Sequence, residues 1–114
     1  MKGDSLGEFE ELVLLATCSL GEEAYANTIK DEVETHSQRT YNLSAIHAAL
    51  YRLEDKGFLS SHLGDPTQKR GGKRKRIFKP TSYGIKSLKK NREMRESLWQ
   101  NIPASTLSDA LYFI

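Results

Sequence analysis

The stretch QKRGGKRKRIFKP, residues 68 to 80, holds the densest group of chemically active side chains in the sequence. Six cations occupy the eight positions from Lys69 to Arg76, and Gly71 and Gly72 lie among them. Cations at this density favour phosphates, because a polyanion that they contact releases its condensed counterions. A Gly-Gly pair lets the backbone turn closely against such a partner. The stretch therefore favours a nucleic acid partner over a solvated loop whose charges only add to solubility.

The charge of the whole chain is strongly asymmetric. Among its 114 residues the formal net charge is only +2, but residues 1 to 68 carry a net −7 and residues 69 to 114 a net +9. Such polarity favours a polyanion approached by the basic half. The length suits one compact domain with an extension, which we divide into a domain, 1–81, and a C-terminal segment, 82–114.

The other reactive residues form no recognisable active site. A phosphate-binding GxxxxGK[ST] motif is absent, because the Gly-Lys pair at 72 and 73 is followed by Arg74. His36, His47 and His62 lie 11 and 15 positions apart beside a single cysteine, which is not a metal-ligand spacing. We expect neither an enzyme nor a bound cofactor or metal ion.

Cys18 lies in the apolar run LVLLATCSL, where a buried, reduced thiol is the ordinary expectation. Acidic residues precede this run, and it is far shorter than a membrane span. We therefore expect neither a signal peptide nor a membrane anchor, and a cytoplasmic protein.

Apolar residues recur at helical spacing in three early segments: 6–20, 22–36 and 44–57. Asp4 or Ser5 is placed to cap the first helix, and Asn42 or Ser44 to cap the third. The intervening segment SQRTYN is too polar for a helix interior and is compatible with a very short strand.

After Gly57 the pattern changes to strand, loop and strand, with FLSSHL and KRKRIFKP as the strands. Thr81 or Ser82 then caps a last long helix that ends before Pro103. The predicted fold is mainly α with a small β-hairpin: a winged helix-turn-helix plus a C-terminal dimerisation helix. In a winged helix the third helix enters the major groove and the hairpin, or wing, lies beside it.

If Ile46, Leu50 and Leu53 face the core, the opposite face of the third helix meets DNA. His47 is the predicted base reader there. Arg52 has an alternative, pairing with Glu54, Asp55 or a carboxylate of the first helix, and Tyr41 is equally compatible with packing. The candidate DNA-binding residues are Thr40, Tyr41, Ser44, His47, Ala48, Tyr51 and Arg52 at the third helix, and Lys69, Arg70, Lys73, Arg74, Lys75 and Arg76 in the wing.

The sequence resembles the PadR-like transcriptional regulators over roughly residues 6 to 88. Its most specific motifs are LYRLE at 50–54 with Gly57, and the Gly-Gly pair at 71 and 72 followed by the basic strand, Thr81 and Gly84. The resemblance implies a bacterial winged-helix repressor that binds inverted-repeat operators in double-stranded DNA. It also implies a homodimer of the compact subgroup, held by a single C-terminal helix.

Apolar residues beyond the minimal winged helix also predict a homodimer, because a monomer of this length would leave them exposed. The candidate dimerisation residues are Phe9, Leu12, Leu98, Trp99 and Ile102. A two-fold dimer can place its recognition helices about 34 Å apart, one turn of DNA. Trp99 is a dimer-core anchor or, as the resemblance permits, a stacking surface for a small aromatic effector.

Two other functions remain open for the same fold. One is a protein-interaction or ligand-sensing module that does not read DNA and whose basic wing meets an acidic partner. The other is an RNA-binding winged helix. Salt-dependent binding to random genomic fragments, with structured RNA as competitor, separates these functions from DNA reading.

Overall fold

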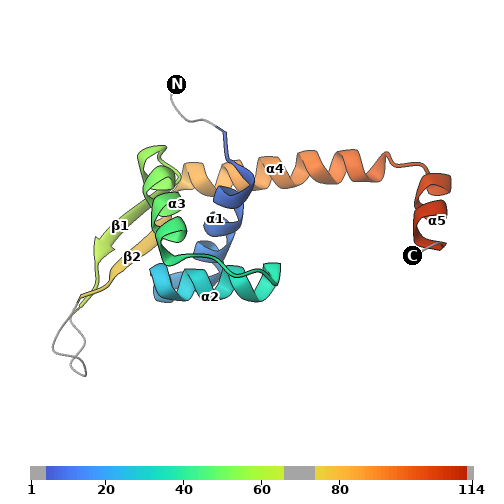
Figure 1. Ribbon diagram of the computed structural model, residues 1–114. Helices are drawn as coiled ribbons and strands as arrows, with labels where there is room; N and C mark the ends of the chain where they lie inside the picture. Colours follow the sequence, from blue (N-terminus) through green and yellow to red (C-terminus); the bar gives the residue numbers. More distant parts are fainter. Residues whose placement is uncertain (1–4, 66–73, 113–114) are drawn as a thin grey trace.

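The computed structural model describes residues 5–65 and 74–112, and within them it is mainly helical with one small hairpin (Figure 1). This confirms the predicted fold class. The elements are α1 (Glu8–Leu20), the 3-10 turn η1 (Gly21–Glu23), α2 (Ala26–Ser37), α3 (Leu43–Asp55), β1 (Leu59–Leu63), β2 (Arg76–Pro80), α4 (Ser82–Gln100) and α5 (Ala104–Tyr112).

The hydrophobic core lies between α1, α2 and α3, and the base of the hairpin and the start of α4 close it. Leu14, Ile29 and Leu50, one from each helix, are fully buried. Phe58 and Leu88 add side chains from the other two elements. Burial of such side chains contributes about 1.5 to 3 kcal/mol each. The apolar stripes read from the sequence therefore face one another.

The hairpin is a two-stranded antiparallel sheet whose register runs from Leu59 opposite Pro80 to Leu63 opposite Arg76. Its base is fixed to the body, because the Phe78 N–H donates to the carbonyl of Ala24 at 2.8 Å. The Phe78 side chain is buried in the core. This anchoring leaves the outer part of the hairpin to project past α3 (Figure 1).

Thr81 and Gly84 join the hairpin to α4. The Thr81 hydroxyl accepts a hydrogen bond from the Gly84 N–H at 3.0 Å and donates one to the carbonyl of Gly57 at 2.7 Å. Gly84 packs so closely that a Cβ there would overlap the carbonyl oxygen of Phe58. A capping threonine three residues before a glycine therefore sets α4 directly against the body.

Glu10 joins α1 to α3. Its side chain is 5% exposed and accepts hydrogen bonds from the Gly7 N–H at 2.8 Å, Arg52 Nε at 3.0 Å and Lys56 Nζ at 2.9 Å. Burial acts to raise the pKa of Glu10, but these hydrogen bonds together outweigh it and hold the pKa below its usual value. The buried carboxylate thus fixes the C-terminal end of α3 against the first turn of α1.

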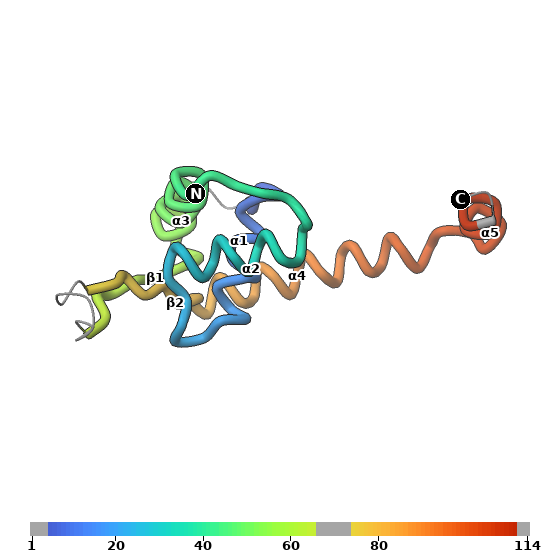
Figure 2. The backbone as a smooth tube through the Cα atoms, turned by 60° about the horizontal axis from the view of Figure 1, so that its bottom comes forward, coloured from blue at the N-terminus to red at the C-terminus, as the bar shows by residue number. Residues whose placement is uncertain are grey.

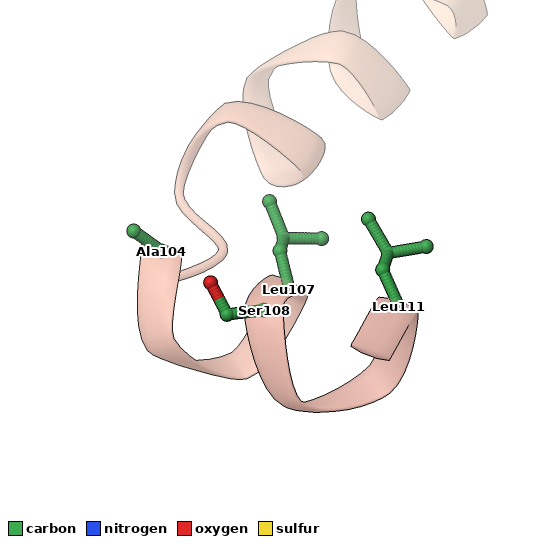
Figure 3. Close-up of a pocket in the computed structure, with 4 residues that line it drawn as sticks. All are labelled: Ala104, Leu107, Ser108 and Leu111. Carbon is green, nitrogen blue, oxygen red and sulfur yellow. The ribbon is translucent and has the colours of Figure 1, made fainter. Parts of the chain in front are cut away.

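Leu88 is the last buried residue of α4, and Arg95 still pairs with Glu11 of α1 at 3.5 Å. The end of α4 extends away from the body, and α5 lies past it (Figures 1 and 2). The molecule is consequently elongated, with principal extents of 60, 35 and 21 Å. The chain after Pro103, for which the sequence pattern gave no conformation, is helical as far as Tyr112. Side chains on both α4 and α5 are left without a covering layer within the described residues. A shallow depression on α5 is lined by Ala104, Leu107, Ser108 and Leu111 (Figure 3).

Several local predictions were wrong. The segment SQRTYN forms no strand in the described structure, because it runs from the end of α2 to the N-cap of α3 without a partner strand. Gly7, not Ser5, is the N-cap of α1, while Asp4 lies outside the described residues. Asn42 is the N-cap of α3, as one of the two predicted alternatives, although its side chain makes no capping hydrogen bond. The second helix starts at Ala26, because residues 21–23 form a 3-10 turn.

Replacing Gly84 by Ala tests the close approach of α4. Alanine favours a helix by about 1 kcal/mol over glycine, but overlap with the Phe58 carbonyl forces α4 away from the body. We expect a net destabilisation of about 1 to 3 kcal/mol in urea unfolding. Lys86→Ala, on the exposed side of the same helix, is the control and should change the stability by less than about 0.5 kcal/mol. A Gly84→Ala protein as stable as its parent would contradict this packing.

Replacing Glu10 by Gln tests the link between α1 and α3. Arg52 and Lys56 lose a charged, buried acceptor, so we expect a loss of about 1 to 3 kcal/mol at neutral pH. Since the folded-state pKa of Glu10 is lowered, its contribution is full above its unfolded pKa of about 4.3 and is lost as the pH falls through the folded value. The stability of the parent should therefore converge on that of Glu10→Gln at acid pH. Glu8→Gln, exposed in the same turn, should not show this convergence; a constant gap between parent and Glu10→Gln would contradict the account.

Candidate nucleic-acid interface

The helix α3 presents two distinct faces, as its sequence predicted. Ile46, Leu50 and Leu53 are fully buried. The opposite face is open at Ser44, Ala48, Tyr51 and Arg52, and Tyr51 is 60% exposed. The ring of His47 lies partly covered beside that of Tyr51, at 6.1 Å between centroids. The exposed face thus offers a hydroxyl, an imidazole, a phenol and a guanidinium around a small alanine.

The chain leading into α3 is fixed by Glu34 of α2. This carboxylate accepts a hydrogen bond from the Tyr41 N–H at 2.8 Å and forms an ion pair with Lys30 at 3.1 Å. The Tyr41 hydrogen bond, followed by that of Lys30, lowers the pKa of Glu34 below its usual value. The Tyr41 ring packs on Phe9, with centroids 4.9 Å apart. Tyr41 therefore has the packing role that the sequence left open, and Thr40 is exposed beside it.

Arg52 pairs with a carboxylate of the first helix, the alternative that the sequence analysis named. Its Nε donates to Glu10, while half of the side chain stays exposed, at 51%. One edge of the guanidinium is thus occupied within the fold. Its assignment as a DNA contact remains a prediction.

The described part of the wing carries three of the predicted cations, all exposed. Arg74 Nε donates to the carbonyl of Gly64 at 3.0 Å. The Lys75 ammonium lies 4.0 Å from the centre of the Tyr25 ring, where the ring face attracts a cation. Lys69, Arg70 and Lys73 lie outside the described residues.

A hydrogen-bonded chain connects the wing to the end of α3. Arg76 donates to the Ser61 hydroxyl at 3.0 Å, and this hydroxyl donates to Glu54 at 2.7 Å. The strand β1 lies between the two charged residues, so wing and helix are positioned relative to each other by side chains as well as by the core. Lys56 and Ser61 were not predicted as positioning residues, because their partners Glu10 and Arg76 are remote in sequence. Glu10 was covered only by the general alternative of a first-helix carboxylate for Arg52.

The candidate dimerisation residues divide into two groups. Leu98 and Trp99 are 65% and 60% exposed near the end of α4, and Ile102 is half-buried. Leu12 is 37% exposed on α1, but Phe9 already packs against its own core. Of the two first-helix candidates, only Leu12 therefore keeps free apolar surface, and Leu98 and Trp99 are the most exposed of the five.

The structure also describes the single cysteine and the side chains of the types that could hold a metal ion. Cys18 is half-buried rather than fully buried, and burial raises the pKa of its thiol. Residues 5–65 and 74–112 contain no group of three His, Cys, Asp or Glu side chains placed to hold a metal ion. In those same ranges the helices are too short or too polar to span a bilayer.

No family model and no curated protein matches the sequence. Solved structures do match the fold. A PadR-like transcription factor from Bacteroides fragilis aligns with a TM-score of 0.66 and 20% identity over 81% of this chain and 84% of its own. RosR of H. salinarum aligns with a TM-score of 0.66 and 20% identity over 96% and 97%. A PadR family transcriptional regulator from Eggerthella lenta aligns with a TM-score of 0.61 and 22% identity over 82% and 80%. The chain therefore has the winged-helix fold of PadR-like transcriptional regulators.

Proposed function

We propose that this protein is a homodimeric transcription regulator that binds double-stranded DNA, with α3 in the major groove and the wing on the phosphate backbone. The observation that carries the proposal is the direct link from wing to helix through Arg76, Ser61 and Glu54. It holds an exposed polar helix face and a cationic strand in one rigid unit. The solved structures of the same fold that are named PadR-like regulators support this assignment.

The two elements have different tasks in this proposal. The wing cations Lys69, Arg70, Lys73, Arg74, Lys75 and Arg76 contact phosphates and set position and affinity, because phosphate contacts carry no base information. Ser44, His47 and Ala48 approach base edges, where sequence is read. Thr40, Tyr51 and Arg52 contact flanking phosphates, and Tyr41 supports Thr40 from the protein side.

The homodimer follows from the exposed apolar end of α4 and makes the operator an inverted repeat. Two copies related by a two-fold axis present two α3 helices, which read half-sites about one turn of DNA apart. A dimer on an operator blocks access to the promoter, so we assign a repressor in the bacterial cytoplasm. We assign residues 1–81 as the DNA-binding unit, and the buried residues Gly84 and Leu88 of α4 pack against its core.

Trp99 is the candidate binding site for a small aromatic effector. Its indole is 60% exposed and lines a groove between α1 and α4 together with Leu15 and Ile85. A flat aromatic molecule can stack on such a ring in the dimer. In the alternative function, an interaction or sensing module that does not read DNA, this groove is the binding site and α3 makes no contact with DNA.

Replacing Lys73, Arg74, Lys75 and Arg76 together by Ala tests the wing. Each lost phosphate contact lowers the slope of log affinity against log salt by about one. Binding should weaken on all duplexes alike, as measured by fluorescence anisotropy at several salt concentrations. Lys90→Ala, an exposed cation of α4, is the control and should leave the slope unchanged. A slope that does not change in the fourfold variant refutes the wing assignment.

Replacing His47 by Ala tests base reading. On a duplex selected from random genomic fragments, we expect a cost of about 1 to 3 kcal/mol that depends on one base position. His36→Ala removes an exposed histidine of α2 and should bind as the parent does. Equal losses on the selected and the scrambled duplex would make His47 a backbone contact.

A further inference from the structure

Each of the three described wing cations contacts an uncharged group of the protein. The contacts are Arg74 to the Gly64 carbonyl at 3.0 Å, Lys75 to the Tyr25 ring at 4.0 Å and Arg76 to the Ser61 hydroxyl at 3.0 Å. None of the ion pairs between described residues involves these three cations. Arg52 differs, because the buried carboxylate of Glu10 compensates its charge. The charges of the described wing are therefore oriented by the protein without a direct carboxylate partner.

Lys75 is the described wing cation that contacts the body of the molecule directly. It precedes β2 at the outer end of the described hairpin, where its carbonyl accepts a hydrogen bond from the Gly64 N–H at 2.7 Å. Tyr25, on the other side of the contact, is the N-cap residue of α2. The backbone hydrogen bond from Phe78 to Ala24 joins the same two parts nearer the base of the wing. The Tyr25 ring therefore provides a further link between body and wing, closer to the outer end.

The start of α2 holds the Tyr25 ring in place. The Tyr25 N–H donates to the Thr28 hydroxyl at 3.0 Å, and the Tyr25 carbonyl accepts from the N–H of Ile29 at 2.9 Å. Ile29 is fully buried in the core. Tyr25 itself is half-buried and lines, with Ile77, a cleft of about 650 Å³ between η1 and the hairpin. A ring attached to the core in this way presents a fixed face to the ammonium.

A neutral ring suits a cation that has to bind a phosphate. The ring face attracts the ammonium but does not neutralise it, so a phosphate can approach its open side. Three carboxylates, Glu22, Glu23 and Asp65, line the same cleft, but none of them forms an ion pair with Lys75. A lysine that becomes fixed gives up much of its rotamer freedom. Because Lys75 is already held in the free protein, less of this freedom is lost on binding.

We infer that Tyr25 is a positioning residue for DNA binding, which holds the Lys75 ammonium ready to contact a phosphate of the duplex. The inference rests on the proposed function and adds a residue that acts through Lys75. Since phosphate contacts carry no base information, the contribution of Tyr25 is the same on every duplex sequence. The contact also keeps the outer end of the wing beside α2 while the duplex is bound.

A double-mutant cycle tests the contact, with binding measured by fluorescence anisotropy on duplexes of random sequence. Tyr25→Leu removes the ring and should weaken binding by about two- to fivefold, the strength of an exposed cation–π contact. Tyr25→Phe keeps the ring and should bind as the parent does. In a Lys75→Met protein, Tyr25→Leu should have no further effect. In a Lys79→Met protein it should weaken binding by the same factor as in the parent, because Lys79 lines the same cleft but, among the described residues, Lys75 alone lies over the ring.

Proton NMR of the unmodified protein tests the contact without a substitution at Tyr25. The ring current shifts the ε-methylene protons of Lys75 upfield, and comparison with the spectrum of Lys75→Met identifies their signal. This upfield shift should persist in the complex with a duplex. Its absence in the free protein, or its loss on DNA binding, would overturn the inference. The NMR result decides the question by itself if urea unfolding shows that Tyr25→Leu is not folded.

Salt-dependent binding of the unmodified protein to duplex DNA tests the proposed function separately. If the protein binds but Tyr25→Leu has no effect, or the same effect with and without Lys75, the inference is wrong and DNA binding stands. The same holds if Tyr25→Phe loses as much as Tyr25→Leu, which would assign the effect to the hydroxyl. It also holds if Tyr25→Leu binds more tightly, because the ring would then withhold Lys75 from DNA. If the unmodified protein binds no duplex, both the inference and the proposed function are wrong.

Discussion

The buried carboxylate of Glu10 is the interaction on which the arrangement of the site depends. It is 5% exposed and accepts hydrogen bonds from two cations of the α3 end, Arg52 and Lys56. A buried charge is tolerated only where its donors are in place. Because Arg52 and Lys56 must both reach the carboxylate, the end of α3 is held in one position against α1. That position decides which face of α3 points outward, and the remainder of the interface is built on it.

The same end of α3 also positions the wing. Glu54 accepts from Ser61, and Ser61 accepts from Arg76. Phe78 and the Thr81–Gly84 contact fix the other side of the hairpin to the core. The two elements to which we assign affinity and base reading are thus fixed to each other by side-chain hydrogen bonds.

Sequence reasoning predicted the features that depend on local patterns. The 3.6-residue spacing of Ile46, Leu50 and Leu53 gave the buried face of α3, and with it the exposed one. Thr81 was predicted as a cap and is one. Features that depend on remote partners were predictable only in part: a first-helix carboxylate was one of the alternatives for Arg52, but no local pattern identifies Glu10, 42 residues away, as that partner. The polar segment before α3 was misread as strand-compatible because nothing local shows that a strand partner is missing.

The central claim, that the chain reads duplex DNA, is tested most directly by the affinity of the unmodified protein for genomic DNA fragments at increasing salt. We expect log affinity to fall linearly with log salt concentration, with a slope that reports several phosphate contacts. We also expect a selected duplex to outcompete both scrambled duplex and structured RNA. Binding that does not respond to salt, or that prefers the RNA, would contradict the account.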